Sequence, residues 1–399
     1  MIRVHRVALD VTNIQAADLA RACGTARFAY NWALARWNEM YQILLADPSA
    51  PKPSQQSLRR ELNSIKHEQF PWMLRVTKCA PQEAIIDLGR AFGNYFAGRA
   101  KRPHFHKKGA ADSFRVSAGF FKVDGRRLRL PLLGWVRMRE TLRWPEAKLV
   151  SVTVSSHRGR WFAGFACEFP DPTPEPHTGD VVGVDVGLRE YVTSDGEHIG
   201  VPRAYRNTER QLRRAQQSLA RKMKGSKNRD KAKAKVVRIH GRVADVRTDW
   251  LHKTTSRLVA EHSVICVEDL NVRGMAGNKH IAKSVMDAGF FEFRRQLEYK
   301  CPASGANLVV ADRWFPSSKM CSTCGAKTKH LPLHVRYWTC ESCGASHHRD
   351  ENAAINLRNY AASSAVSACG EFKTADDHGR TATSSSHLCE AGTRHQTGR

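Results

Sequence analysis

The sequence has few features of an exported or membrane protein. It contains no apolar run near the roughly 18 residues that cross a bilayer. Its first residues, Met1 to Arg6, lack the apolar stretch of a secretory signal. Convincing internal repeats are absent, and seven of the eleven cysteines are scattered, as is typical of reduced thiols. We therefore expect a cytoplasmic protein that has no membrane partner.

Acidic residues are scarce relative to basic ones. The chain has 38 Asp plus Glu against 64 Lys plus Arg, a formal net charge of +26 and a pI near 10. This charge says little about fold, but it favours a polyphosphate partner, because each phosphate that a cation neutralises releases counterions. An anionic membrane surface is the alternative partner. At 399 residues the chain is long enough for two or three domains.

The N-terminal part shows strand patterns on either side of helical ones. Helical periodicity covers 16–45, 55–66 and 81–96, and Pro81 suits a first helical turn. The alternating segments typical of strands are 1–10, 120–123, 127–130, 150–154 and 161–169. The later strands of this part indicate a small β-barrel or sandwich. A linker is expected at 171–180, which is rich in proline.

Two basic segments are candidates for binding a phosphate backbone. The first is the loop 99–108, in which Phe105 stands among cationic side chains. The second is the helical stretch 203–253, which has 17 Lys plus Arg against 4 Asp plus Glu and a predicted break at 225–228. A solvated loop and a solvated helix face are the alternative interpretations. The candidate side chains are Arg102, Lys107, Lys108, Arg213, Arg214, Arg221, Lys222 and Lys224.

The C-terminal part contains apolar strands that end in acids. Asp185 closes the apolar segment 181–187, Glu268 lies near the end of 264–270, and Asp350 opens an amphipathic helix. Acids at the ends of adjacent parallel strands can converge with one from a helix start. Such a cluster repels itself unless divalent cations neutralise it, and oxygen ligands suit Mg²⁺ or Mn²⁺. Two such cations, about 4 Å apart, would support phosphodiester hydrolysis.

Each of these acids also has a simpler interpretation. Asp185 could form a turn, Glu268 could end a strand at the solvent, and Asp350 could cap a helix. Their occurrence together, in a basic chain and with the paired cysteines described next, favours one shared metal site. Asp269 and Asp312 lie near the ends of these strands too, and we rank them behind the other three.

The four remaining cysteines form two Cys-x-x-Cys pairs separated by fifteen residues. Four thiolates at this spacing can surround one zinc ion, and a glycine after each pair eases its tight turn. Two disulfides are the alternative, which the absence of export features disfavours. We therefore predict one structural Zn²⁺ held by Cys321, Cys324, Cys340 and Cys343.

With these motifs the chain resembles the TnpB family, the OrfB-type proteins of bacterial and archaeal insertion sequences. The architecture is also similar to that of the miniature type V CRISPR effectors. The matching blocks are Gly183–Gly187, Val267–Asn271, Phe315–Gly325, Trp338–Gly344 and His348–Leu357. The resemblance is strong over about 180–360 and weaker before it.

The resemblance implies a multidomain α/β protein. It implies an RNase H-like RuvC nuclease domain at 181–316 and 347–362, split by a zinc ribbon at 317–346. The 1–15 and 105–170 segments would be a β-barrel wedge domain, and 16–104 a helical recognition domain. We expect residues 363–399, rich in Ser, Thr, Ala, Gly and His, to be a disordered tail.

The activity that the resemblance implies is RNA-guided endonuclease cleavage of DNA. Asp185, Glu268 and Asp350 would bind two catalytic Mg²⁺ or Mn²⁺ ions. The partners would be a guide RNA and a double-stranded DNA target with a short flanking motif, and one protein copy would form the ribonucleoprotein. Such a particle would lie in a prokaryotic cytoplasm and associate with the nucleoid when bound to DNA.

Two departures and two alternatives qualify this hypothesis. His348 stands where the family commonly has an acid, two residues before Asp350, and the opening 7–11 lacks the usual basic, proline-containing pattern. A strand-transfer transposase of RNase H-like fold would need the same acids but no guide. A catalytically silent zinc-ribbon regulator of transposition would need none of the acids for its cellular effect.

Overall fold

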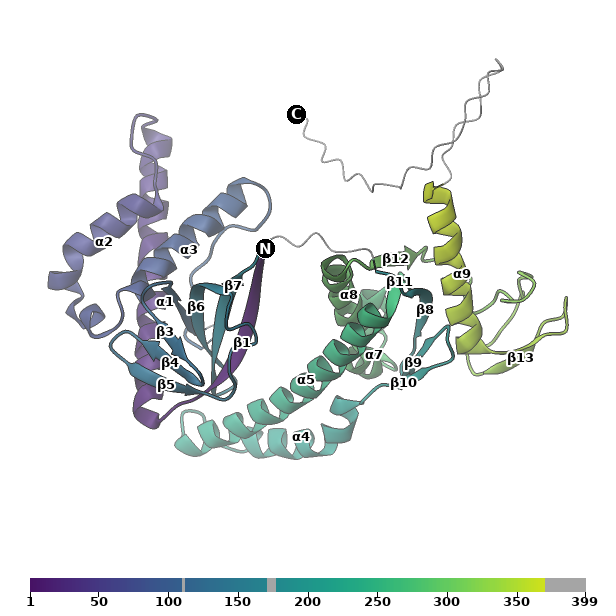
Figure 1. Ribbon diagram of the computed structural model, residues 1–399. Helices are drawn as coiled ribbons and strands as arrows, with labels where there is room; N and C mark the ends of the chain where they lie inside the picture. The colour runs from purple at the N-terminus through teal and green to yellow at the C-terminus, as the bar shows by residue number, and fades with distance from the viewer. Residues whose placement is uncertain (110–111, 171–176, 370–399) are drawn as a thin grey trace, which may run out of the picture. The chain divides into compact units, whose positions relative to one another are not determined.

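A computed structural model describes residues 1–109, 112–170 and 177–369 of the chain (Figure 1). The chain divides into two compact units, Met1–Pro172 and Thr173–Arg399. Most of the predicted linker, 171–176, lies outside the described residues, and so does the predicted tail from residue 370 onward. Within the described ranges, no helix combines the length and the apolar character that crossing a membrane requires.

The first unit contains one antiparallel sheet of seven strands, in the order β2-β6-β7-β1-β5-β4-β3. The chain's first strand lies inside this sheet, between β7 and β5, so residues 1–10 pair with strands of the later segment. Among the described residues no pairing joins β2 to β3, so hydrogen bonds leave the sheet open rather than closing it into a barrel. The strands are β1 (Ile2–Asp10), β2 (Ser113–Ser117), β3 (Lys122–Asp124), β4 (Arg127–Leu130), β5 (Gly134–Met138), β6 (Lys148–His157) and β7 (Arg160–Glu168).

The helices of the first unit have a core of their own. Their centre contains Leu34, Leu58 and Leu88, together with Trp37 and Phe92, whose rings stack 4.3 Å apart. The third helix opens two residues before Pro81, which therefore lies within the first turn, where its missing N–H costs no intrahelical bond. The elements are α1 (Asn13–Ala46), α2 (Gln55–Gln69), the 3₁₀ helix η1 (Pro71–Arg75) and α3 (Cys79–Phe96).

The second unit is built on a five-stranded sheet in the order β10-β9-β8-β11-β12. Strands β8, β11 and β12 run parallel, whereas β9 and β10 form antiparallel hairpins at the edge. This is the arrangement expected of adjacent apolar strands that carry acids at their carboxyl ends. The strands are β8 (Asp180–Val186), β9 (Glu190–Thr193), β10 (His198–Gly200), β11 (His262–Glu268) and β12 (Asn307–Ala311).

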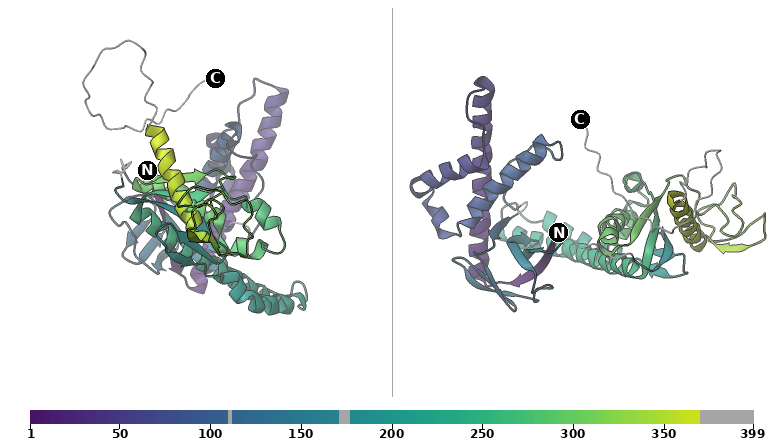
Figure 2. Two further views of the ribbon diagram at one scale, coloured as in Figure 1. Left: turned by 90° about the vertical axis from the view of Figure 1, so that its right-hand side faces the viewer. Right: turned by 45° about the horizontal axis from the view of Figure 1, so that its top comes forward.

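Helices cover both faces of this sheet. Helices α5 (Lys227–Glu261) and α8 (Phe290–Ser304) pack on the face that carries Val184 and Val267, and α9 (Arg349–Cys369) packs on the face that carries Cys266. Figure 1 and the right-hand view of Figure 2 show α9 on the side of the strands opposite α5 and α8. Helix α9 extends beyond residue 362, where the nuclease domain was expected to end.

The remaining elements of the second unit connect this core. Helix α4 (Ala204–Ala220) folds back on α5 through Leu212, Ala215 and Ile239, and the break between the two helices falls at 221–226. The predicted break at 225–228 therefore lies slightly too late in the sequence. Two short strands form a hairpin before α9. The other elements are α6 (Val272–Gly277), α7 (Ala282–Ala288), β13 (Tyr337–Thr339) and β14 (Ser346–His348).

Candidate metal centres

Two of the predicted acids lie at the same edge of the second sheet. Asp185 is the penultimate residue of β8 and Glu268 is the last residue of β11, and the parallel pairing places Val267 opposite Val184. Alternate residues of a strand face the same way, so Asp185 shares the face of Gly183 and Glu268 shares the face of Cys266. That face is the one covered by α9. Both carboxylates therefore lie on the side of the sheet from which the third acid comes.

Gly183 determines how closely α9 approaches β8. A Cβ atom at this position would lie 2.0 Å from the carbonyl oxygen of Ala354 and 2.5 Å from the amide nitrogen of Arg358. Any other residue would collide with the helix backbone, so the glycine is required for close packing. The first turn of α9 carries Asp350, where a carboxylate also suits the positive end of the helix dipole. Close packing of α9 thus brings Asp350 near enough for its charge to act on the carboxyl group of Asp185.

The pKa shifts of Asp185 and Glu268 indicate that these two acids share one environment. Burial raises the pKa of Asp185 well above its ordinary value, and the negative charges of Glu268 and Asp350 raise it further. Arg349 and Arg336 act in the opposite direction on the same pKa. Burial also raises the pKa of Glu268. A cluster of this kind is unfavourable when fully ionised, and its oxygen-only donors suit a hard divalent cation.

Two neighbours of the acids were not identified from the sequence. The guanidinium of Arg336 donates from Nη1 to both carboxylate oxygens of Asp350, each at 2.7 Å. The hydroxyl of Ser317 donates to Glu268, which lowers the pKa of that carboxyl against the effect of burial. Neither contact can be recognised from spacing in the sequence, because it forms only when the segment between β12 and α9 folds.

The spare acids near the same strand ends have other partners. Asp269 accepts from Arg294 at 2.5 Å and from Arg313 at 2.6 Å, and these hydrogen bonds lower its pKa. Asp312 accepts from the backbone amide of Trp314 at 2.8 Å, a local turn contact. Both acids are therefore engaged by partners outside the group of Asp185, Glu268 and Asp350.

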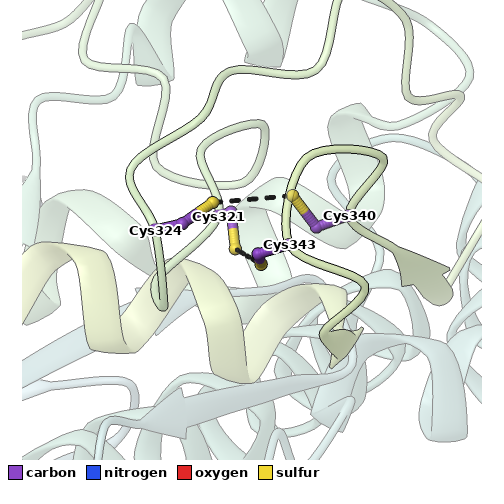
Figure 3. Close-up of side chains that lie close together, drawn as sticks. All are labelled: Cys321, Cys324, Cys340 and Cys343. Carbon is purple, nitrogen blue, oxygen red and sulfur yellow. Dashed lines mark hydrogen bonds between the residues drawn. The ribbon is translucent and has the colours of Figure 1, made fainter.

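The four cysteines form one cluster between β12 and α9 (Figure 3). Their sulfur atoms all lie within 4.8 Å of one another, with Cys321 and Cys343 at 3.7 Å and Cys324 and Cys340 at 3.7 Å. A tetrahedron with zinc–sulfur bonds of about 2.3 Å has edges of about 3.8 Å, whereas a disulfide is about 2.05 Å long. All four cysteines are free thiols. The cluster therefore has the dimensions of a structural zinc site.

The backbone around these cysteines repeats itself. Gly325 donates to the carbonyl oxygen of Cys321 and Gly344 to that of Cys340, each at 2.9 Å. Both glycines have the left-handed φ that suits the predicted tight turns, 75° and 74°. The imidazole Nε2 of His347 lies 3.0 Å from the sulfur of Cys321, where it can orient a thiolate ligand. No feature of the sequence had singled out His347.

The candidate phosphate-binding cations are exposed on both units. Arg102, Lys107 and Lys108 lie in the connection between α3 and β2, where Arg102 also donates to Asn38 at 3.0 Å. The others lie on one hairpin of the second unit, and exposure leaves them accessible to a phosphate backbone. These are Arg213 and Arg214 on α4, and Arg221, Lys222 and Lys224 in the turn that leads to α5.

Three family models match the chain. A model described as "Probable transposase", of the OrfB type from IS605 elements, matches residues 164–279. A Cas12f1-like TNB domain matches 290–357, the segment that contains the four-cysteine cluster. A helix-turn-helix model of the OrfB type matches residues 1–43. In the structure that segment is a strand followed by most of a single 34-residue helix, α1.

The chain is similar to curated proteins over most of its length. It is 40% identical to a "Putative RNA-guided DNA endonuclease" of Streptomyces pristinaespiralis, covering 90% of this chain and 89% of the relative. It is 32% identical to the "Putative RNA-guided DNA endonuclease InsQ" of Escherichia coli K12, covering 90% and 91%. The fold matches a Cas12f1 chain solved with sgRNA and target DNA, at a TM-score of 0.53 and 13% identity over 86% of this chain and 83% of that one. The chain therefore belongs to the TnpB/OrfB family of IS605-type insertion sequences.

Proposed function

We propose that this protein is an RNA-guided DNA endonuclease of its transposable element, and that Asp185, Glu268 and Asp350 are its catalytic acids. The observation that carries the proposal is the meeting of three acids from β8, β11 and α9 at one sheet edge, where the other two oppose the ionisation of Asp185. Mg²⁺ or Mn²⁺ bound there would activate water and stabilise the leaving oxygen of a phosphodiester. The names of the relatives support the same activity.

The chain's own residues prepare this centre. Ser317 fixes the carboxylate of Glu268 through its hydroxyl hydrogen bond. Arg336 neutralises Asp350 and holds both its oxygens in one orientation. A cleft beside Glu268 is lined by Arg273, Arg294 and Arg313, cations that suit the flanking phosphates of a DNA strand. Orientation of acids by neighbours and the placement of phosphates by arginines are both needed for an in-line attack.

The exposed cations extend this proposal to the nucleic acids. We infer that the loop 99–108 and the α4–α5 hairpin contact the phosphates of guide RNA or target DNA, while base pairing reads the sequence. When the log of the binding constant is plotted against the log of the salt concentration, each cation removed from a phosphate contact should make the negative slope shallower by about 0.7–0.9. Changing Lys222 and Lys224 to Gln should therefore flatten the salt dependence of RNA or DNA binding. An unchanged slope would remove this hairpin from the interface.

The decisive experiment purifies the protein from cells that express its genomic flank and sequences the RNA that co-purifies. A discrete RNA with a variable end would supply the guide for a cleavage assay with Mg²⁺. Changing Asp185, Glu268 or Asp350 to Ala should abolish cleavage and leave RNA binding intact. Asp312→Ala is the matched control, because Asp312 follows β12 at the same edge and is expected to tolerate the change.

The other outcomes of this experiment identify the competing functions. Joining of a 3′ hydroxyl to target DNA without any RNA would indicate a strand-transfer transposase. A cellular effect on transposition that persists in Asp185→Ala would indicate a zinc-ribbon regulator without catalysis. Substantial cleavage in any of the three variants would overturn the proposed catalytic acids. One zinc ion that the purified protein loses when Cys321 is changed would test the structural ion separately.

A further inference from the structure

A second group of metal-ligating side chains lies near the start of α9. It comprises His198 on β10, His348 at the end of β14 and Glu351 in the first turn of α9, and each offers one ligand atom within 4.8 Å of the others. Neither the cysteine cluster nor the proposed catalytic acids include these residues. Three elements that are distant in sequence thus present two imidazoles and a carboxylate to one point.

The atoms of this group have the spacing of metal ligands. Oε1 of Glu351 lies 3.1 Å from Nε2 of His198 and 3.6 Å from Nδ1 of His348. A tetrahedral ion with ligand bonds of about 2.0–2.1 Å requires ligand atoms about 3.3–3.4 Å apart. The two observed separations fall on either side of that value. The ligand atoms of the two imidazoles also lie within 4.8 Å of each other, and exposed His198 has room to turn toward a shared ion.

Two further observations favour a ligand here over a simple ion pair. Nδ1 of His348 is buried and has no hydrogen-bond partner among the described residues, although it points to within 3.6 Å of Glu351. A buried, unpartnered nitrogen is costly, and coordination would satisfy it. On the other side, Oε2 of Glu190 lies 3.4 Å from Nδ1 of His198, which leaves Nε2 directed at Glu351. A carboxylate behind a ligating histidine is the usual way to fix its ring.

We propose that His198, His348 and Glu351 form a second zinc-type site that ties the β9–β10 hairpin to the first turn of α9. Two imidazoles and one carboxylate are a donor set for Zn²⁺ or a similar transition ion, and they discriminate against Mg²⁺, which prefers oxygen alone. Glu190 acts as a positioning residue for His198. The site needs neither guide RNA nor DNA, so it stands or falls independently of the proposed nuclease activity.

The test counts zinc ions in the full-length protein. Protein stripped of metal is titrated with Zn²⁺ in a large excess of Mg²⁺, which competes with Zn²⁺ for the oxygen-only acids. We expect about two equivalents in the parent protein, one from the four cysteines and one from this site. His198→Ala and His348→Ala should each bind about one equivalent, whereas His240→Ala, an exposed histidine on α5, should still bind two.

Binding of zinc by other histidines needs a control. The chain's last thirty residues include three histidines that could hold zinc loosely, so the titration is done in a background where these are changed to Ala. They are His378, His387 and His395. Substitution with Co²⁺ gives a second readout, because thiolate ligands produce intense charge-transfer absorption and nitrogen–oxygen ligands produce only weak d–d bands. Loss of the weak bands alone in His198→Gln would locate the ion here.

Three results would overturn the proposal. One equivalent of Zn²⁺ in the parent protein would leave the group as an ion pair between His198 and its two glutamates. Two equivalents that persist in both His198→Ala and His348→Ala would mean an adventitious ion elsewhere. A melting temperature that rises with added Zn²⁺ equally in the parent protein and in His198→Gln would also place the second ion at another site.

Discussion

The packing of α9 on β8 gives the sharpest test of how this fold assembles its acids. Gly183→Ala adds one methyl group at a point where the carbonyl oxygen of Ala354 would lie 2.0 Å away and the Cβ of Leu357 2.9 Å away. Ordinary contacts at a Cβ begin near 3.4 Å. The obstacle is mostly helix backbone, which cannot rotate aside as a side chain can, so α9 must move away from the strand by about 1 Å or more.

This displacement has two measurable consequences. Overpacking of a tight core costs typically about 1–3 kcal/mol, and a backbone collision belongs at the upper end. For a unit of this size, each kcal/mol lowers the melting temperature by about 2–4 °C, so we expect a decrease of about 6–12 °C. Asp350 moves with the helix, and a misplacement of 1 Å at a reacting centre can cost about 100-fold in rate. Cleavage should therefore fall more than stability alone explains.

The assay compares Gly183→Ala with Gly200→Ala by thermal unfolding and by guided DNA cleavage well below either melting temperature. Gly200 ends β10, and a methyl group added there would meet nothing within 4 Å, so its substitution should stay within about 0.5 kcal/mol of the parent protein. Equal melting temperatures and equal rates for the two variants would refute the role assigned to the close approach of α9.

Three other predictions concern the same unit. Cys321→Ser should release zinc and lower the melting temperature, since a ribbon of this kind folds with its metal; unchanged zinc content by elemental analysis would contradict the site. The side-chain amide of Asn356 donates to the carbonyls of Ser317 and Met320, at 2.7 and 2.6 Å. Asn356→Ala removes these donors and should lower the free energy of unfolding in urea by about 1–3 kcal/mol. Asn356→Asp should not fully recover that stability. Burial lowers the pKa of Lys300 from 10.5 to about 8. The unfolded chain therefore holds this proton more tightly, and stability should rise from pH 8 toward 10.5 in the parent protein relative to Lys300→Met; parallel stability curves for the two proteins would argue against the shift.

The features that could be predicted well are those encoded locally. Cysteine spacing and the glycines after each pair specify a tetrahedral cluster because both knuckles are short. Apolar runs that end in acid specify strands whose carboxyl ends meet at one sheet edge, as Asp185 and Glu268 do. In both cases a few consecutive residues determine the geometry.

Features that depend on contacts between distant segments were not predicted. Ser317 and Arg336 reach their acids only after the segment before α9 has folded over the sheet. The open edge of the seven-stranded sheet could not be predicted either. Closure depends on whether β2 and β3 pair, and the residue pattern of a strand does not specify which strand it pairs with. Strand β5 was not predicted because it is short and because exposed Trp135 stands next to buried Val136, which breaks the apolar–polar alternation in the sequence.

The contacts of α9 suggest that the cysteine cluster and the acids form one cooperative structure. The amide nitrogen of Ser322, inside the first cysteine pair, donates to Asn352 on α9 at 2.9 Å. Arg349, the first residue of α9, donates to the carbonyl of Pro332 at 2.7 Å, and Arg336 of the same segment holds Asp350. Loss of zinc would loosen all three interactions at the turn of helix that carries the acid. Removal of zinc should therefore reduce cleavage even at temperatures where the rest of the unit stays folded, because the cysteine segment fixes the position of Asp350, a proposed catalytic acid, as well as its own fold.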